Sequence, residues 1–358
     1  MRAYQIHEYG GLEGLARRDL PEPTPGPREA VVSVRARAIN YRDLLILRRR
    51  YLLPGAPDVV PLSDGAGEVI AIGADVTRVK VGDRVAAAYF PRWRGGLLEI
   101  ESAMDQFGCT RDGMLADYAL ADEEALVHLP RHLTFEEGAT LPCAGVTAWS
   151  AVAGGRKPTP GQTVLTIGTG GVALFAVQFA KLFGARVLSI TSGESKAAAL
   201  RRLGADAVIV TNECPDWPSK LRDLTDGRGV DHVIETGGVN TLPKSLASCA
   251  WNAEVALVLA LPEGTIEVAA LRGLVTLRRL FVGSRATFEE MNRAIETHAL
   301  RPVIDRTFTF ENAHEAYHHF AEKRHVGKVV ISDSATDHSE KQSASACTAH
   351  FTETGDWP

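Results

Sequence analysis

The sequence predicts an α/β protein with two parts, a β-rich region of short strands and a doubly wound parallel sheet. Residues 1 to about 140 contain many short strand-like stretches separated by glycine and proline, as in barrels and sandwiches. From Thr163 onward, strand-like and helix-like stretches alternate, which is typical of a parallel sheet covered by helices. A glycine-rich turn joins the first of these strands to its helix, in the stretch Thr163–Ala173 (TVLTIGTGGVA).

The elements of the β-rich region come first along the chain. Ala30–Ala38 (AVVSVRARA) alternates like a strand with one buried face. Further short strands are predicted at Gly65–Gly73, Asp83–Ala88, Ala116–Leu120 and Ala125–Leu129. A helix is predicted from Phe135, because Thr134 can cap its start and Glu137 completes a capping box. A second helix is predicted at Val146–Ala153.

The alternating part continues after the glycine-rich turn. Strands are predicted at Arg186–Thr191, Ala207–Val210, His232–Thr236, Glu254–Leu259 and Arg279–Gly283, and helices at Glu194–Leu203, Trp217–Thr225 and Leu242–Ser248. After Gly283 the pattern changes to helices at Phe288–Thr297 and Phe310–Lys323 and strands at Ile304–Phe308 and Lys328–Ile331. The simplest topology returns this last segment to the N-terminal region. Residues 336–358 are polar, and we expect them to form a disordered tail.

The glycine-rich turn has the spacing of a dinucleotide-binding loop. Gly168 permits the tight turn, Gly170 lets the backbone approach a pyrophosphate, and Ala173 is small enough for close packing of helix on strand. Gly171 and Val172 open the helix, whose free N–H groups and partial positive charge suit phosphates. The alternative is an ordinary glycine-rich connection between a strand and a helix.

Composition narrows the class of protein. The chain has 358 residues, of which 45% are hydrophobic, and a net charge of −5, which gives no support for binding to nucleic acid or anionic membranes. We expect no transmembrane span and no secretory signal, because no apolar run is long enough and the N-terminus lacks an apolar core segment. The cysteines are odd in number and scattered, which favours a reducing cytoplasm.

Eight segments, in order along nearly the whole chain except the tail, resemble the medium-chain dehydrogenase/reductases. They are AINYRDLLI (38–46), PLSDGAGEVIAIG (61–73), VGDRV (81–85), LPCAGVTAW (141–149), TIGTGGVALFAVQFAK (166–181), RRLGADAVI (201–209), DGRGVDHVIETGG (226–238) and HVGKVVI (325–331). Within that family the chain is similar to the zinc-free quinone oxidoreductase and zinc-type alcohol dehydrogenase-like branch. The resemblance implies a GroES-like catalytic domain at 1–142 and 285–335 and a Rossmann domain at 143–284. It also implies a homodimer in which Val275–Val282 is the edge strand that pairs across a two-fold axis.

The resemblance also bears on metal. Zinc members of the family have a cysteine where this chain has Asn40–Asp43, a histidine followed by an acid where it has Leu62–Gly65, and a third ligand at Cys143. Only Cys143 of these ligands is kept, and residues 89–114, where the family's structural zinc needs four cysteines, contain Cys109 alone. We therefore expect no zinc at either place. Cys143 is better read as a small apolar residue than as a nucleophile.

Without zinc, hydrogen-bond donors must polarise the substrate oxygen, and the candidates lie just after the first long strand. The predicted catalytic residues are Asn40, Tyr41 and Asp43, with Arg42 and Tyr51 beside them. By the resemblance, Asn40 and Thr147 lie close to the nicotinamide ribose. Tyr41 either donates to the substrate or packs between the two domains. Asp43 either acts as an acid or base, or only braces Arg42 and caps the following helix.

The choice of nicotinamide cofactor depends on the end of the second strand. An NAD site normally has an acid there, whereas this chain has Thr191 and Ser192, and Glu194 follows in the first helical turn. Ser192 and Lys196 could hold a 2′-phosphate, so NADP(H) is favoured, with NAD(H) possible. The resemblance places Lys328 near the cofactor phosphates. It places Gly237, Gly238 and the loop Val282–Ser284, hence Val282 and Ser284, along the nicotinamide, although turn geometry alone explains such glycines.

These features predict a zinc-independent, NAD(P)H-dependent oxidoreductase that transfers a hydride to a quinone, an enone or an aldehyde-type carbonyl. One alternative is an NAD-dependent alcohol dehydrogenase. Another, from a different class, is a nucleotide-binding module without turnover. We expect the pocket walls to include parts of 89–112, among them Phe90, Trp93 and Phe107.

Overall fold

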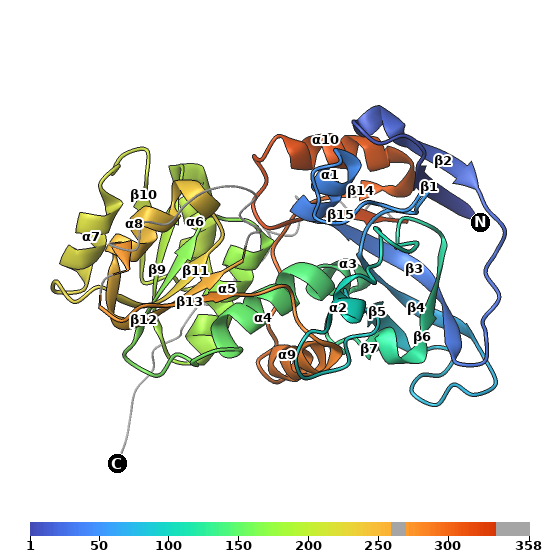
Figure 1. The fold of residues 1–358 in the computed structure, drawn as a ribbon, viewed down its shortest axis with the longest axis horizontal. Coiled ribbons are helices and arrows are strands. Elements are labelled where there is room, and N and C mark those ends of the chain that lie inside the picture. Colours follow the sequence, from blue (N-terminus) through green and yellow to red (C-terminus); the bar gives the residue numbers. More distant parts are fainter. Residues whose placement is uncertain (259–269, 272, 334–358) are drawn as a thin grey trace, which may run out of the picture.

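The structure, a computed structural model, describes residues 1–258, 270–271 and 273–333. Two sheets lie next to each other along the long axis of the molecule (Figure 1). The predicted tail, 336–358, and the end of the predicted strand Glu254–Leu259 lie outside the described residues. Within the described part, no helix combines the length and apolarity that crossing a bilayer requires.

The first sheet is the predicted doubly wound one. All its strands are parallel, in the order β10-β9-β8-β11-β12-β13, so the chain starts in the middle and winds first to one side and then to the other. The strands are β8 (Thr163–Ile167), β9 (Arg186–Thr191), β10 (Ala207–Val210), β11 (Val230–Glu235), β12 (Cys249–Leu257) and β13 (Thr276–Arg279). The reversal between β8 and β11 is the place where such folds bind ligands, at the carboxyl ends of the strands.

The second sheet combines both ends of the chain. Its order is β14-β15-β3-β4-β5-β7, with β6 also paired to β3, and β1 and β2 form a separate ribbon. The strands are β1 (Arg2–Ile6), β2 (Leu15–Asp19), β3 (Glu29–Ile39), β4 (Asp64–Ile72), β5 (Arg84–Ala87), β6 (Tyr118–Asp122), β7 (Leu126–His128), β14 (Ile304–Thr309) and β15 (Lys328–Ser332). Because β15 pairs antiparallel with β3, the predicted return of the C-terminal segment is confirmed.

The helices are α1 (Tyr41–Leu47), α2 (Ile100–Ala103), α3 (Phe135–Ala139), α4 (Val146–Ala153), α5 (Gly171–Leu182), α6 (Glu194–Arg202), α7 (Trp217–Leu224), α8 (Leu242–Ala247), α9 (Arg285–Thr297) and α10 (Ala313–Ala321). Helices α3 to α10 overlap the stretches predicted as helical, whereas the short helix α2 was not predicted. The capping box of α3 is confirmed, since Thr134 Oγ1 accepts from the Glu137 N–H over 3.2 Å and Glu137 Oε2 accepts from the Thr134 N–H over 2.8 Å.

One predicted strand is misplaced. The predicted strand Arg279–Gly283 overlaps β13 only at Arg279, where β13 ends; residues 280–283 are not a strand, and Val282 has a φ of 56°. A β-branched residue in this left-handed region cannot continue a strand. The chain therefore leaves the sheet edge early and forms a loop that leads into α9. β13 remains the edge strand of the sheet, within the predicted stretch Val275–Val282.

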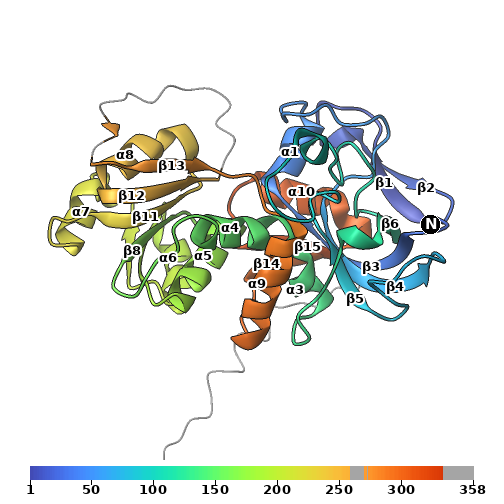
Figure 2. The same cartoon turned by 60° about the horizontal axis from the view of Figure 1, so that its bottom comes forward.

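The two sheets are joined by a common apolar core. One buried cluster contains Ala38, Phe90 and Val330 from the second sheet region and Val164 and Phe179 from the first. Helices α4 and α5 lie between the sheets (Figure 2). Because apolar side chains from both sides share this core, the junction behaves as one packed unit.

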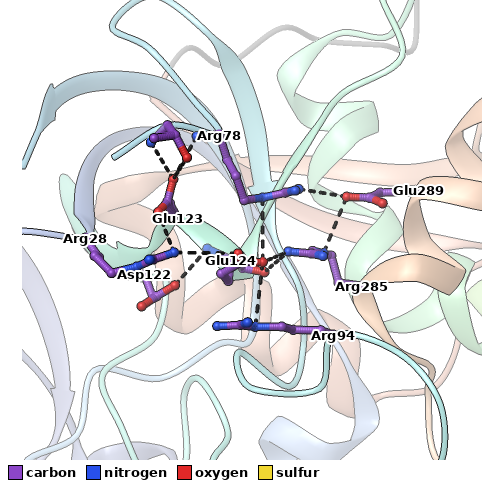
Figure 3. A network of polar contacts seen from close by, with 9 residues as sticks. Arg28, Arg78, Arg94, Asp122, Glu123, Glu124, Arg285 and Glu289 are labelled. Carbon is purple, nitrogen blue, oxygen red and sulfur yellow. Dashed lines mark hydrogen bonds and ion pairs between the residues drawn. The ribbon is translucent and has the colours of Figure 1, made fainter. Parts of the chain in front are cut away.

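An ion-pair network ties the start of α9 to the second sheet (Figure 3). Arg285, the first residue of α9, pairs with Glu124, and its Nε lies 3.5 Å from Glu289 Oε1. Arg94 Nε lies 3.7 Å from Glu124 Oε2. In the backbone, the Arg285 N–H donates to Trp93 O over 2.9 Å. These contacts therefore hold the 93–94 loop against the loop that precedes α9.

Candidate active site

The glycine-rich turn forms a bare platform at the start of α5. Gly168 has a φ of 82°, and its N–H donates to Ile190 O over 2.8 Å, which fixes the turn at the end of β8. Gly170 is the N-cap of α5. A Cβ built on Gly168 or Gly170 would meet no atom within 4 Å, so the space in front of the helix start is open. The first N–H groups of α5, from Gly171, Val172 and Ala173, have no partner inside the helix.

This platform fits a dinucleotide. Its backbone N–H groups and helix dipole suit a pyrophosphate, and the missing side chains allow close approach. Thr191, at the end of the neighbouring strand, has a buried Oγ1 without a hydrogen-bond partner in the described part of the chain. Ser192 follows in an exposed position. The residues present therefore fit the nicotinamide dinucleotide predicted from the sequence.

Lys328 lies at the centre of the buried polar group beside this platform. Its Nζ donates to Asn40 Oδ1 over 2.5 Å and to Ile39 O over 2.8 Å, and it lies 3.8 Å from Asp64 Oδ2. The side chains of Lys328 and Asp64 are 3% and 0% exposed. The stem of Lys328 passes over Gly171, but its ammonium group turns to Asn40 and Asp64 rather than outward.

Asp64 is the residue here that the sequence reasoning did not select. Its Oδ1 accepts from Ser63 Oγ over 2.8 Å and its Oδ2 from the Cys143 N–H over 3.2 Å. The ion pair between Asp64 and Lys328 joins segments far apart in the sequence, so no local pattern marks Asp64. Burial raises the pKa of the Cys143 thiol, so Cys143 is a neutral group, as its interpretation as a small apolar residue requires.

Asp43 caps the helix that begins beside Asn40. Its Oδ2 accepts from the Asn40 N–H over 2.7 Å, and Arg42 Nη1 lies 3.4 Å from its Oδ1. Asp43 therefore braces Arg42 and caps the helix, the structural role predicted as the alternative to a role as acid or base. Burial raises the pKa of Asp43 to about 6, against the lowering effects of Arg42 and the Asn40 N–H.

Arg42 organises a second buried group around Gln106. Gln106 Oε1 accepts from Arg42 Nη2 over 3.3 Å, from Tyr51 Oη over 2.9 Å and from Tyr89 Oη over 3.2 Å. The Arg42 guanidinium also lies over the Tyr89 ring, 4.6 Å from its centroid. Burial raises the pKa of both tyrosines, so they are neutral phenols. Tyr89 and Gln106 were missed because nothing in their local sequence marks them.

The predicted nicotinamide loops occupy the neighbouring strand ends. Gly283, next to the strained Val282, packs on α4, since a Cβ there would meet Ser150 Oγ at 2.6 Å and Val146 Cγ1 at 2.8 Å. Thr147 is a buried residue of the same helix. Backbone strain at a buried β-branched residue is a feature of functional loops. Ser284 uses its hydroxyl to cap α9, where it accepts from the Thr287 N–H over 3.2 Å.

The loop at Gly237 and Gly238 is held by a buried carboxylate. Glu235 is buried, with 1% of the residue exposed. Its Oε1 accepts from the N–H groups of Gly237 and Gly238 over 2.7 and 3.1 Å. Thr236 Oγ1 donates to Ile167 O over 2.5 Å, so the loop lies against the end of β8. The sequence indicated the glycines but not Glu235, which fixes them.

The remaining predicted residues lie at the edge of this group. Lys196 Nζ donates to Lys323 O over 3.0 Å, which joins α6 to the turn after α10. Tyr41 is 41% exposed and lies 5.5 Å from Lys323 Nζ, so it is not packed between the two sheets. Phe90 contacts Trp93 and the loop residue Phe281, with ring centroids 5.9 and 5.0 Å apart. Phe107 belongs to the core of the second sheet; like Phe90 it is 0% exposed, and its place in a pocket wall stays a prediction.

Known families match both parts of the chain. The alcohol dehydrogenase GroES-like domain matches residues 26–131, and the zinc-binding dehydrogenase family matches residues 171–297. A zinc-type alcohol dehydrogenase-like protein of Schizosaccharomyces pombe is 38% identical over 92% of this chain and 98% of its own length. A quinone oxidoreductase of Pseudomonas aeruginosa is 30% identical over 91% of this chain and 98% of its own. The crystal structure of an NAD-dependent alcohol dehydrogenase has a TM-score of 0.83 at 31% identity, with 93% and 99% of the two chains covered.

The name of the second matching family raises the question of zinc. A catalytic zinc takes about three protein ligands from cysteine, histidine and carboxylates. Within residues 1–258, 270–271 and 273–333, no group of three or more His, Cys, Asp or Glu could hold a metal ion. Beside Lys328, Asp64 and Cys143 are ligand types, but the Lys328 ammonium already pairs with Asp64, and burial raises the pKa of the Cys143 thiol. The residues at this site do not fit a catalytic zinc.

Proposed function

The chain belongs to the medium-chain dehydrogenase/reductase superfamily, and from this premise we propose that it is a zinc-independent, NADPH-dependent reductase of small molecules with an electrophilic carbonyl or quinone group. The substrates are quinones, enones or aldehydes. The observation that carries the proposal is the buried Lys328–Asn40 group, which places a cation and an amide donor beside the platform at the start of α5. Hydrogen-bond donors of this kind replace a metal in polarising an oxygen.

The roles of the residues follow from their places. The start of α5 holds the pyrophosphate, and the loops fixed by Glu235 and by the α9 network hold the nicotinamide end. The bound nicotinamide supplies the hydride. Asn40 faces the reacting oxygen as a donor, and the aromatic group around Phe90 and Phe281 excludes water from that side. Asp43 serves by holding Asn40 and Arg42 rather than by moving a proton.

The preference for NADPH rests on the end of β9. No carboxylate lies at Thr191 or Ser192 to hold a ribose 2′-OH, and Lys196 is close enough in sequence to reach a 2′-phosphate from α6. In the structure the Lys196 ammonium donates a hydrogen bond to Lys323 O, and this hydrogen bond must break before Lys196 can bind a phosphate. That contact is the reason to keep an NAD-dependent alcohol dehydrogenase as the second candidate.

Assembly and location are part of the same proposal. We propose a homodimer formed through β13, the edge strand, next to which Trp251 and Leu274 are 77% and 73% exposed. Sedimentation equilibrium tests it, and a monomer at micromolar concentration would contradict it. Cys109, Cys143, Cys214 and Cys249 are free thiols, which is consistent with a cytoplasmic enzyme.

The test is turnover of the purified chain with each dinucleotide and a panel of quinones, enones, aldehydes and alcohols. The proposal predicts oxidation of NADPH by at least one unsaturated carbonyl or quinone, with kcat/KM at least about tenfold lower for NADH. Oxidation of alcohols with NAD⁺ alone would favour the second candidate. Tight binding of NADPH without turnover on any acceptor would indicate a nucleotide-binding module.

A further inference from the structure

We propose that Lys328 is a positioning residue, whose ammonium fixes the amide of Asn40 so that Asn40 Nδ2 donates to the oxygen of the substrate. The inference rests on the proposed function and adds a role for Lys328, and for Asp64 behind it. In the reaction the hydride goes to the electrophilic carbon of the substrate. The π electron pair moves to the oxygen, and a proton from water completes the product.

The ammonium of Lys328 determines which way the Asn40 amide faces. An ammonium group has three donors and no acceptor, so the amide atom that faces it over 2.5 Å must be Oδ1. Nδ2 then faces away from Lys328. As a residue Asn40 is 7% exposed, and its Nδ2 is buried without a partner among the residues that the structure describes. A buried amide donor with no partner is costly, and the group expected to pair with it is an acceptor that arrives with a ligand.

Besides its hydrogen bond to Asn40, the Lys328 ammonium is held by two further groups. Asp64 Oδ2 lies 3.8 Å from its Nζ, and Ile39 O accepts from it over 2.8 Å. Asp64 is fixed in turn by Ser63 Oγ and the Cys143 N–H. The segment that carries Asp64 is strained, because Leu62 has a φ of 71°, which is rare for a residue with a side chain. Such strain persists only where the surroundings enforce it, so the position of Asp64 is specified by the fold.

The geometry also connects this group to the dinucleotide platform. The Lys328 stem crosses Gly171, the first residue of α5. In addition, the Gly327 N–H donates to Thr169 O over 2.9 Å within the glycine-rich turn. Lys328 thus reaches Asn40 directly beside the platform that receives the cofactor. This arrangement places the Asn40 donor close to where the nicotinamide meets its substrate.

The experiment compares Lys328→Met, Asn40→Asp and the double variant in the full chain, with a quinone or enone that the wild type reduces. Each single variant is expected to lower kcat by about 30- to 100-fold, whereas the Kd of NADPH changes by less than about twofold. The double variant is expected to lose no more than about the larger of the two single losses, because both changes remove the same donor. Lys181→Met, on the far part of α5, is the matched control with unchanged kcat.

Two further measurements keep the inference testable. Lys328→Met leaves Asp64 buried without its cation, so Lys328→Met/Asp64→Asn removes both charges if the single variant does not fold. In protein labelled with ¹⁵N-asparagine, the side-chain NH₂ signals of Asn40, identified by their absence in Asn40→Asp, are expected to shift and broaden in the Lys328 variants. This readout needs no turnover.

The outcomes separate the two proposals. A wild type that reduces no acceptor contradicts the proposed function. A wild type that turns over, with Lys328→Met at wild-type kcat, contradicts the positioning role. A loss that appears only in the Kd of NADPH, or multiplicative losses in the double variant, also contradicts it. Unchanged Asn40 NH₂ signals in the Lys328 variants contradict it whether or not the protein turns over.

Discussion

The side chain of Lys328 passes so close to Gly171 that a Cβ on Gly171 would lie 2.7 Å from Lys328 Cδ. The second of the paired glycines in the turn is therefore needed for a lysine near the other end of the chain. We expect Gly171→Ala to displace Lys328 and to lower the free energy of unfolding by about 1–3 kcal/mol, as overpacking does. Urea denaturation measures it. Wild-type stability together with wild-type kcat would show that Lys328 does not need this space.

Gly170→Ala is expected to weaken cofactor binding while it leaves stability almost unchanged. Its Cβ would meet no protein atom within 4 Å, so it would fill only the space meant for the pyrophosphate. The N-cap preference for glycine and the entropic benefit of alanine nearly offset, so stability should change by less than about 1 kcal/mol. The Kd of NADPH, measured by fluorescence titration, should rise at least about tenfold. Gly95→Ala, whose Cβ has an ordinary contact at 3.6 Å, is the control, and equal affinities in all three proteins would contradict the placement of the pyrophosphate.

Glu124→Gln is expected to loosen the start of α9. Glu124 is the acid that Arg285 and Arg94 share, and its loss leaves the largely buried Arg285 with only the more distant Glu289 and removes the ion pair of the exposed Arg94 (Figure 3). We expect a loss of about 1–2 kcal/mol in the free energy of unfolding, smaller at high salt. Glu101→Gln, on the exposed face of α2, is the control. Because the strained loop at Val282 leads into α9, the KM for NADPH should rise as well. A stability independent of salt would argue against an electrostatic role for this network.

His325 should make stability depend on pH. The pKa of His325 is lowered to about 4, mainly by burial, and its ring stacks on Phe320 with centroids 4.4 Å apart. Lys328, His319 and Lys196 contribute to this lowering of the pKa, and Asp305 opposes it. Between about pH 6.5 and about pH 4, His325 therefore binds a proton in the unfolded chain but not in the folded chain. Stability from this residue is complete above about pH 6.5 and falls as pH drops toward about 4.

His325→Phe keeps an aromatic ring against Phe320 and removes the titratable imidazole. The loss of unfolding free energy between about pH 7 and about pH 5 should be smaller in this variant than in the wild type, by about 1–2 kcal/mol. His318→Gln, an exposed residue of α10, should leave the wild-type profile unchanged. Parallel pH profiles for His325→Phe and the wild type would show that His325 ionises freely in the folded protein.

The sequence predicts much of this fold because its signals are local. The capping box at Thr134 and Glu137, the strand Arg186–Thr191 and the helix Val146–Ala153 are confirmed, since each depends on residues within one element. The strand at 279–283 was wrong because the left-handed φ of Val282 has no local signal. Asn40 could be selected by its place after a strand. Its partner Asp64, and the direction of the Lys328 ammonium, depend on contacts between distant segments, which no periodicity encodes.

The most direct test of the central claim is the transfer of deuterium from NADPH labelled at C4 of the nicotinamide to a quinone or enone, followed by mass spectrometry, in protein treated with a zinc chelator. The account predicts that the label from one face of the ring appears in the product at the same rate with and without chelator. A product without label, or a label that appears only after zinc is added back, would contradict it.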